Sequence, residues 1–141
     1  MPVLTRWMIK TSLVYLALAL LVGVWQAAGV VFPGLWTPPG LRVVAFHLLA
    51  VGWLTLLIFG VALWMFPKFS LARPRGPEWL GWSGFGLLNA GLLARVVAEP
   101  AAALASGSAG GWGWVLVGSA GLQWLGGLAL VAAAWVRVKV K

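Results

Sequence analysis

Cysteine is absent from the 141-residue chain, and histidine and acidic residues are scarce, with one His and two Asp plus Glu. Without thiols the chain can form no disulfide, iron–sulfur cluster or thiolate metal site, so any metal must be held by nitrogen, oxygen or thioether ligands. Only 9% of the residues are charged and 62% are apolar, whereas soluble domains are about a quarter charged. The composition excludes an ordinary soluble domain and indicates a membrane protein.

The apolar residues fall into four long runs separated by breaks rich in Pro and Gly. A helix that spans a bilayer needs about 20 apolar residues, and each run has about that length. We therefore predict an all-α membrane protein with a bundle of four transmembrane helices, as a single domain over residues 1–141. The predicted helices lie at about 10–32, 41–66, 79–98 and 112–136. The first run is longer than the apolar stretch of a typical signal peptide, so we expect it to be retained as a span.

Positive charges are distributed unevenly between the two ends of these helices. Arg42 and Arg95 lie toward one end, and all other Lys and Arg residues lie toward the other. They are Arg6, Lys10, Lys68, Arg73, Arg75, Arg137, Lys139 and Lys141. The positive-inside rule then predicts that both termini and the central linker face the cytoplasm of a bacterial-type inner membrane. We interpret the net charge of +8 as orienting the helices in the lipid bilayer, and we expect no nucleic-acid partner.

Three ionisable residues are predicted within the outer half of the membrane, where charged groups are costly and therefore candidates for function. His47 lies early in the second span, and Arg95 and Glu99 are spaced i,i+4 near the end of the third. A neutral imidazole is a common ligand of haem iron, and a nearby guanidinium suits the haem propionates. We therefore single out His47 as a metal ligand and His47 with Arg95 as cofactor-binding residues. The alternative is that His47 bonds a carbonyl between helices and that Arg95 pairs with Glu99.

Small and polar residues inside the spans are the remaining candidates. Glycines at spacings of three or four predict one face of the third span that either a helix or a flat macrocycle could approach closely. This face comprises Gly81, Gly84, Leu88, Gly91 and Arg95. Asn89 and Gln123 are expected to form hydrogen bonds between helices, with a polar pathway as the alternative.

The segments around these residues resemble a known family. His47–Pro67, with Gly52, Trp53 and Gly60, resembles helix II of small proteins related to subunit I of haem-copper oxidases, especially the cbb3-type, and to the NnrS family. Leu88–Pro100, which contains Gly91 and Arg95, resembles the helix that follows. In this family the helix II histidine ligates a low-spin haem, so the resemblance implies haem b bound at His47.

The chain departs from this family in the ligands that it lacks. The second axial histidine and the copper-site histidines belong to later helices, so we do not expect a complete oxidase. Met65 lies eighteen residues after His47, about 27 Å along a helix, which excludes it as the second ligand of the same haem. A bis-histidine haem would therefore need His47 from two chains, so we expect a homo-oligomer that shares the haem.

The sequence leaves three functions open. The first is a haem-binding protein for electron transfer, haem handling or sensing. The second is a non-haem structural or assembly subunit of a larger respiratory complex. A small transporter that uses Arg95, Glu99, Asn89 and Gln123 is less favoured, because transporters need broken helices and polar sites near the midplane.

Overall fold

The computed structural model describes residues 1–67, 69–70, 76–105 and 110–138, and these form helices joined by short connections. The elements are α1 (Val3–Val31), α2 (Leu41–His47), the π-helix η1 (Leu48–Thr55), α3 (Leu56–Met65), α4 (Glu78–Leu104) and α5 (Gly110–Trp135). Because α2, η1 and α3 are continuous, the described residues contain four helices long and apolar enough to cross a membrane. The prediction of an all-α protein with four spans is confirmed to this extent.

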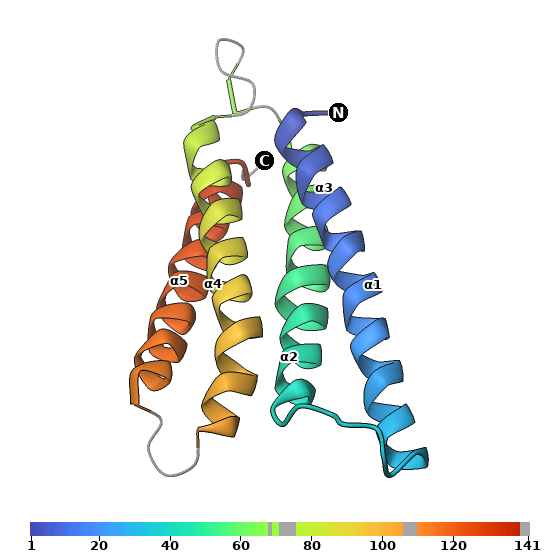
Figure 1. The fold of residues 1–141 in the computed structure, drawn as a ribbon. Helices are drawn as coiled ribbons and strands as arrows, with labels where there is room; N and C mark the ends of the chain where they lie inside the picture. The colour runs from blue at the N-terminus through green and yellow to red at the C-terminus, as the bar shows by residue number, and fades with distance from the viewer. Residues whose placement is uncertain (68, 71–75, 106–109, 139–141) are drawn as a thin grey trace.

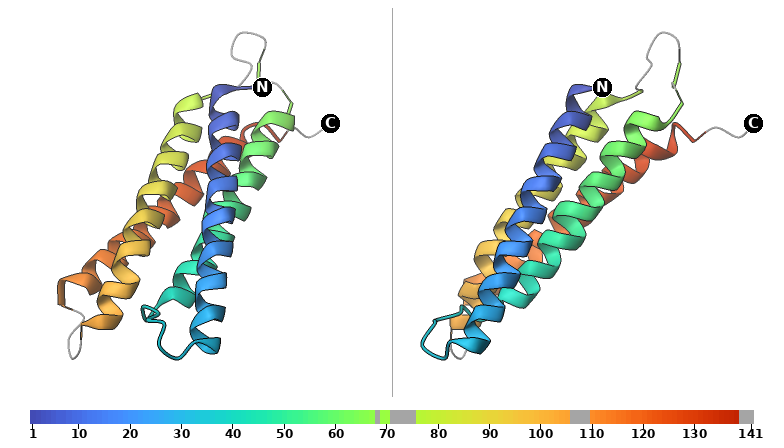
Figure 2. Two further views of the ribbon diagram at one scale, coloured as in Figure 1. Left: turned by 45° about the vertical axis from the view of Figure 1, so that its right-hand side comes forward. Right: turned by 90° about the vertical axis from the view of Figure 1, so that its right-hand side faces the viewer.

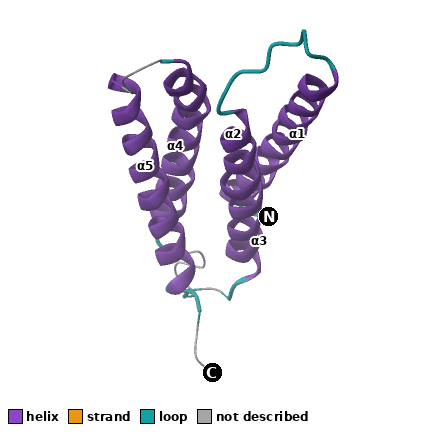
Figure 3. Cartoon of the chain, turned by 90° about the horizontal axis from the view of Figure 1, so that it is seen from below, coloured by secondary structure: helices purple, strands orange, loops and turns teal. Residues whose placement is uncertain are grey.

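The helices are arranged as two pairs (Figure 1). One pair is α1 with the continuous span α2–η1–α3, and the other is α4 with α5, as the view from below also shows (Figure 3). The beginnings of α1 and α4 lie at the same end of the bundle as the ends of α3 and α5 (Figure 2). We call this the terminal end, and the opposite end, where α2 begins, the loop end. The start of α1, the helix ends beside the central linker and the end of α5 thus lie together, as predicted, while the linker cations Lys68, Arg73 and Arg75 and the tail cations Lys139 and Lys141 lie outside the described residues.

Two helices extend beyond their predicted bounds. The first begins at Val3 rather than near Lys10, because Arg and Lys have good helix propensity and need not lie in the apolar part of the span. The third continues through Pro100 to Leu104. A proline removes one hydrogen bond, but three alanines, the best helix formers, follow it here. Its 27 residues extend over about 40 Å.

The second span contains a π-helix that the sequence analysis did not predict. Its buried residues Val44, Leu48, Gly52, Leu56 and Gly60 follow one another at intervals of four. In a regular α-helix this spacing would rotate the buried face by roughly 160° between the first and the last of them. A π-helix turns less per residue because its hydrogen bonds connect i to i+5. The π segment therefore keeps these residues facing α1.

Glycine lets α4 and α5 approach closely. A Cβ atom at Gly91 would lie 2.8 Å from the carbonyl oxygen of Ser119, and one at Gly126 would lie 2.8 Å from the backbone nitrogen of Leu88. At Gly84 it would lie 2.7 Å from the side chain of Leu130. Of the two occupants considered for the glycine face of the third span, the structure therefore has a helix, α5, at these positions.

Polar contacts connect the two helix pairs. At the terminal end Arg137, which is 6% exposed, donates hydrogen bonds to the carbonyl oxygens of Leu63, of Phe66 at 2.7 Å and of Pro67 at 3.2 Å. These carbonyls lie at the C-terminus of α3, where a cation is favourable. Arg137 thus caps α3 from the end of α5.

Candidate functional site

His47 is the last residue of α2 and immediately precedes the π-helix. Its Nδ1 atom lies 2.8 Å from the carbonyl oxygen of Val43, one turn earlier. Because a carbonyl oxygen only accepts, Nδ1 carries the proton in a neutral ring, and Nε2 keeps its lone pair. No other hydrogen bond of this side chain occurs within the described residues. The imidazole is thus oriented with one nitrogen available as a ligand or acceptor.

Arg95 of α4 is held by two side chains. Its Nη1 atom lies 2.9 Å from Oε1 of Glu99, and Nε donates to the hydroxyl of Ser119 at 3.4 Å. The side chains of Arg95 and Glu99 are 15% and 17% exposed. The ion pair is the contact that the alternative interpretation of Arg95 anticipated, and it fixes the plane of the guanidinium.

Ser119 joins this pair to α5. Its hydroxyl donates to the carbonyl oxygen of Gly91 at 2.8 Å and accepts from Nε2 of Gln123 at 3.1 Å. Gly91 has no side chain in the way, so the hydroxyl can reach the backbone of α4. Ser119 was not among the predicted site residues, because a serine in an apolar helix more often bonds within its own helix. Gln123 was expected to bond between helices, but its hydrogen bond is to Ser119 on the same helix.

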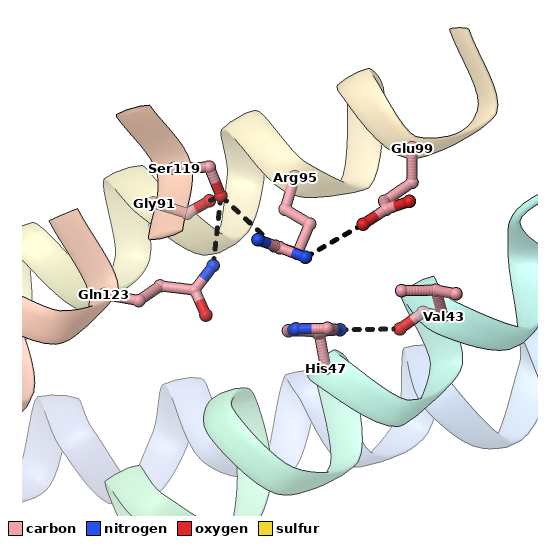
Figure 4. A network of polar contacts seen from close by, with 7 residues as sticks. All are labelled: Val43, His47, Gly91, Arg95, Glu99, Ser119 and Gln123. Carbon is pink, nitrogen blue, oxygen red and sulfur yellow. Dashed lines mark hydrogen bonds and ion pairs between the residues drawn. The ribbon is translucent and has the colours of Figure 1, made fainter. Parts of the chain in front are cut away.

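The structure brings these residues to one region between α2 and the α4–α5 pair. Figure 4 shows the side chains of Arg95 and Gln123 pointing toward the region that the ring of His47 also faces. Because α4 continues to Leu104 and not only to the predicted end at about residue 98, Arg95 is nine residues from its end, about 14 Å. We refer to His47, Arg95, Glu99, Ser119 and Gln123 as the polar cluster.

Backbone contact at the loop end determines how close α2 and α4 come beside this cluster. Gly40, the residue before α2, has a φ of +82°, a conformation that favours glycine. A Cβ atom there would lie 3.1 Å from the carbonyl oxygen of Glu99. The chain entering α2 therefore lies directly against α4 at the residue that pairs with Arg95.

The second polar contact expected between helices lies deeper in the bundle. Tyr15 of α1 is 5% exposed and its hydroxyl donates to Oδ1 of Asn89 on α4 at 2.6 Å. The amide nitrogen of Asn89 donates to the carbonyl oxygen of Phe85 at 2.7 Å. The prediction that Asn89 bonds between helices is confirmed, and its satisfied amide leaves no reason to assign it to a polar pathway.

The donor set of the polar cluster restricts its chemistry. Within the described residues no group of three or more His, Cys, Asp or Glu side chains could hold a metal ion. A bare ion such as zinc needs several protein ligands, and the cluster offers one imidazole nitrogen and one carboxylate that is already paired. A group that brings its own ligands and needs one more nitrogen is compatible with this set.

Compared with known proteins, the chain matches no protein-family model, no curated protein and no solved structure at a significant level.

Proposed function

We propose that the protein binds haem b within the membrane, with Nε2 of His47 as an axial ligand of the iron, and acts in electron transfer, haem handling or sensing. The observation that supports this most directly is the hydrogen bond of 2.8 Å between Nδ1 of His47 and the carbonyl oxygen of Val43. Histidines that bind a metal usually donate their other ring N–H in this way, which fixes the tautomer and makes the ligand nitrogen more basic. The resemblance of His47–Pro67 to helix II of the oxidase family led us to the same residue.

The donor set favours haem over a bare metal ion. A haem iron already has its equatorial nitrogens and takes one or two axial ligands from the protein, so a single imidazole is sufficient. When bound, haem would supply one-electron chemistry. The chain's own contribution would be to hold the imidazole and to keep the group away from water.

Arg95 would hold an anionic group of the cofactor. Glu99 and Ser119 occupy Nη1 and Nε, but no hydrogen bond within the described residues uses Nη2. A guanidinium with a fixed plane and a free N–H edge is suited to a carboxylate such as a haem propionate. Glu99 and Ser119 would therefore act as positioning residues for Arg95.

A second strong ligand for a low-spin haem would have to come from outside this chain. The sequence has one histidine and no cysteine. Met8 is fully buried beside Gly60, and Met65 ends α3 at the terminal end, so neither lies near His47. We propose that a second copy contributes its own His47. Counting subunits in a haem-loaded preparation checks this, and a monomer with a bis-histidine spectrum would contradict it.

For the membrane orientation we propose that the terminal end faces the cytoplasm of a bacterial-type inner membrane. The support is the distribution of charge, because Arg6 and Lys10 lie near the start of α1 and Arg137 follows α5, all at the terminal end, while Arg42 at the start of α2 and Arg95 of α4 lie toward the loop end.

A visible spectrum of the full chain, purified after expression with ample haem, tests the proposed function. We expect a Soret band, with sharp α and β bands on reduction, in the natural protein and their loss in His47→Ala. Gln26→Leu is the matched control. It also removes a polar side chain at the loop end, and the hydrogen bonds of Gln26 are long, at 3.5 and 3.4 Å, so we expect this variant to keep the spectrum. A folded but colourless natural protein, or a His47→Ala protein with an unchanged spectrum, would disprove the assignment.

A second candidate function is a non-haem structural or assembly subunit of a larger membrane complex. One observation favours it: a Cβ atom added at Gly118 or Gly121 of α5 would meet no atom within 4 Å, so this glycine face of the helix is open to another helix. A colourless protein that co-purifies in a fixed ratio with other membrane subunits would favour this candidate over haem binding.

A further inference from the structure

A cavity of about 100 Å³ lies at the terminal end, remote from the polar cluster. It is partly open and is bordered by the start of α1, the end of α3, the start of α4 and the end of α5, with Thr5, Leu63, Glu78, Trp82, Ala133 and Arg137 among its lining residues. A single buried water needs only about 10–15 Å³, so a group of several atoms fits. Its lining combines apolar side chains with the polar side chains of Thr5, Glu78 and Arg137, which suits an amphipathic molecule.

Thr5 of α1 offers an unused hydrogen-bond donor beside the cavity. The hydroxyl of Thr5 forms no hydrogen bond within the described residues although Thr5 is only 1% exposed. Among the described residues no fully buried side-chain oxygen or nitrogen lacks a partner, so the hydroxyl of Thr5 keeps a small accessible surface, and Thr5 lines the cavity. A polar atom that is removed from water but left unpaired is costly unless a ligand or water bonds to it.

The N-terminus of α1 adds donors beside this hydroxyl. The helix begins after Pro2, which makes no side-chain cap, and its first carbonyl-bonded amide is that of Arg6. The N–H groups of Val3, Leu4 and Thr5 are therefore uncapped, and all three residues line the cavity. Uncapped N–H groups and the helix dipole together favour an anion.

The charges around the cavity are also mainly positive. Arg137 lines it, and Arg6 and Lys10 form a second hollow with Trp7 on the other side of Val3. Neither Arg6 nor Lys10 has a hydrogen bond or ion pair within the described residues. Glu78 is the acidic residue of the lining; it is exposed and has an interaction partner of its own. Val3 and Trp82 line the cavity and are also partly exposed on the surface of the bundle, at 49% and 39%, so an apolar tail can leave past them toward lipid.

We propose that this cavity binds the headgroup phosphate of an anionic membrane lipid, whose oxygens accept hydrogen bonds from Thr5 and the first amides of α1. The acyl chains would leave the cavity between Val3 of α1 and Trp82 of α4 and extend into the bilayer. The site does not depend on haem, because it lies at the end of the bundle opposite to His47.

Lipid retention by the full chain, measured by native mass spectrometry from detergent, tests this proposal. The probes are phosphatidylglycerol and phosphatidylcholine with the same acyl chains, and inorganic phosphate alone. We expect phosphatidylglycerol to be retained preferentially, and Thr5→Val to weaken its binding roughly tenfold, as for one hydrogen bond to a charged group. Glu78→Gln should strengthen it, because this change removes the opposing charge.

Ser12→Ala is the matched control. Ser12 is also buried and on α1, but its hydroxyl already donates to the carbonyl oxygen of Ile9 at 2.8 Å, so we expect unchanged lipid binding. Equal retention of the two lipids, or equal loss in Thr5→Val and Ser12→Ala, would overturn the proposal. Binding of inorganic phosphate without retained lipid would show a free-anion site and would overturn it as well.

Discussion

Tyr15 and Asn89 join the two helix pairs in the interior of the bundle, through a hydrogen bond of 2.6 Å from the tyrosine hydroxyl to the amide oxygen. The residues are 74 positions apart in the sequence. The contact is possible because Gly52 gives the ring of Tyr15 room: a Cβ atom there would lie 2.7 Å from it. A glycine on the π-helix thus allows a polar bond between α1 and α4.

Removal of the tyrosine hydroxyl should loosen the contact between the pairs. We expect Tyr15→Phe to lower the free energy of unfolding by about 1 kcal/mol, the scale of interhelical hydrogen bonds in membranes. Unfolding in mixed micelles measures this. In the Asn89→Leu background the same change should cost much less; an equal cost in both backgrounds would show that the hydrogen bond contributes nothing.

Two glycines of α4 should respond in opposite ways to alanine. Gly91→Ala places a methyl group 2.8 Å from the carbonyl oxygen of Ser119, and we expect a loss of about 1–3 kcal/mol from overpacking. Gly86→Ala meets no atom within 4 Å and should stabilise the helix by up to about 1 kcal/mol. Thermal unfolding of both variants provides the comparison, and similar values would contradict the packing of α4 against α5.

Arg95→Leu separates the two interpretations of this arginine. If Arg95 holds a haem propionate, the variant should retain less haem per protein than the natural chain. If Arg95 only pairs with Glu99, the change should lower the stability, because it leaves a largely buried carboxylate without its partner, and it should leave the haem content unchanged. Haem content and thermal unfolding of the same preparation measure the two quantities, and unchanged haem content would remove Arg95 from the proposed site.

The membrane orientation can be tested because the chain has no cysteine. Single cysteines at Ser70 and at Thr37 lie in the connections at the terminal end and the loop end, respectively. We expect a membrane-impermeant thiol reagent to label Thr37→Cys in intact cells and Ser70→Cys only after lysis. The reverse pattern would disprove a cytoplasmic terminal end.

The helices and their glycine contacts were predictable, because span length and the spacing of small residues depend on local sequence. The π-helix was not predictable from the sequence. Between Val44 and Gly60 every fourth residue is buried, and this spacing indicates a π-helix only when all of these residues are known to face the same neighbouring helix. The extension of α4 past Pro100 was not predicted, because proline usually marks the end of a helix. His47 and Arg95 were recognised as candidates from the cost of polar groups in lipid, whereas Ser119 has no such signal.

The contact between Gly40 and Glu99 means that the backbone, and not side-chain packing, limits how closely α2 approaches α4 beside the polar cluster. Side chains change rotamer within nanoseconds, but two backbones in direct contact at Gly40 and Glu99 cannot move closer and have no side chain between them to rearrange. The connection before α2 therefore acts as a fixed spacer between His47 and Arg95. Any larger residue at position 40 would push α2 and α4 apart at the loop end of the polar cluster, while every side chain of the cluster stays the same.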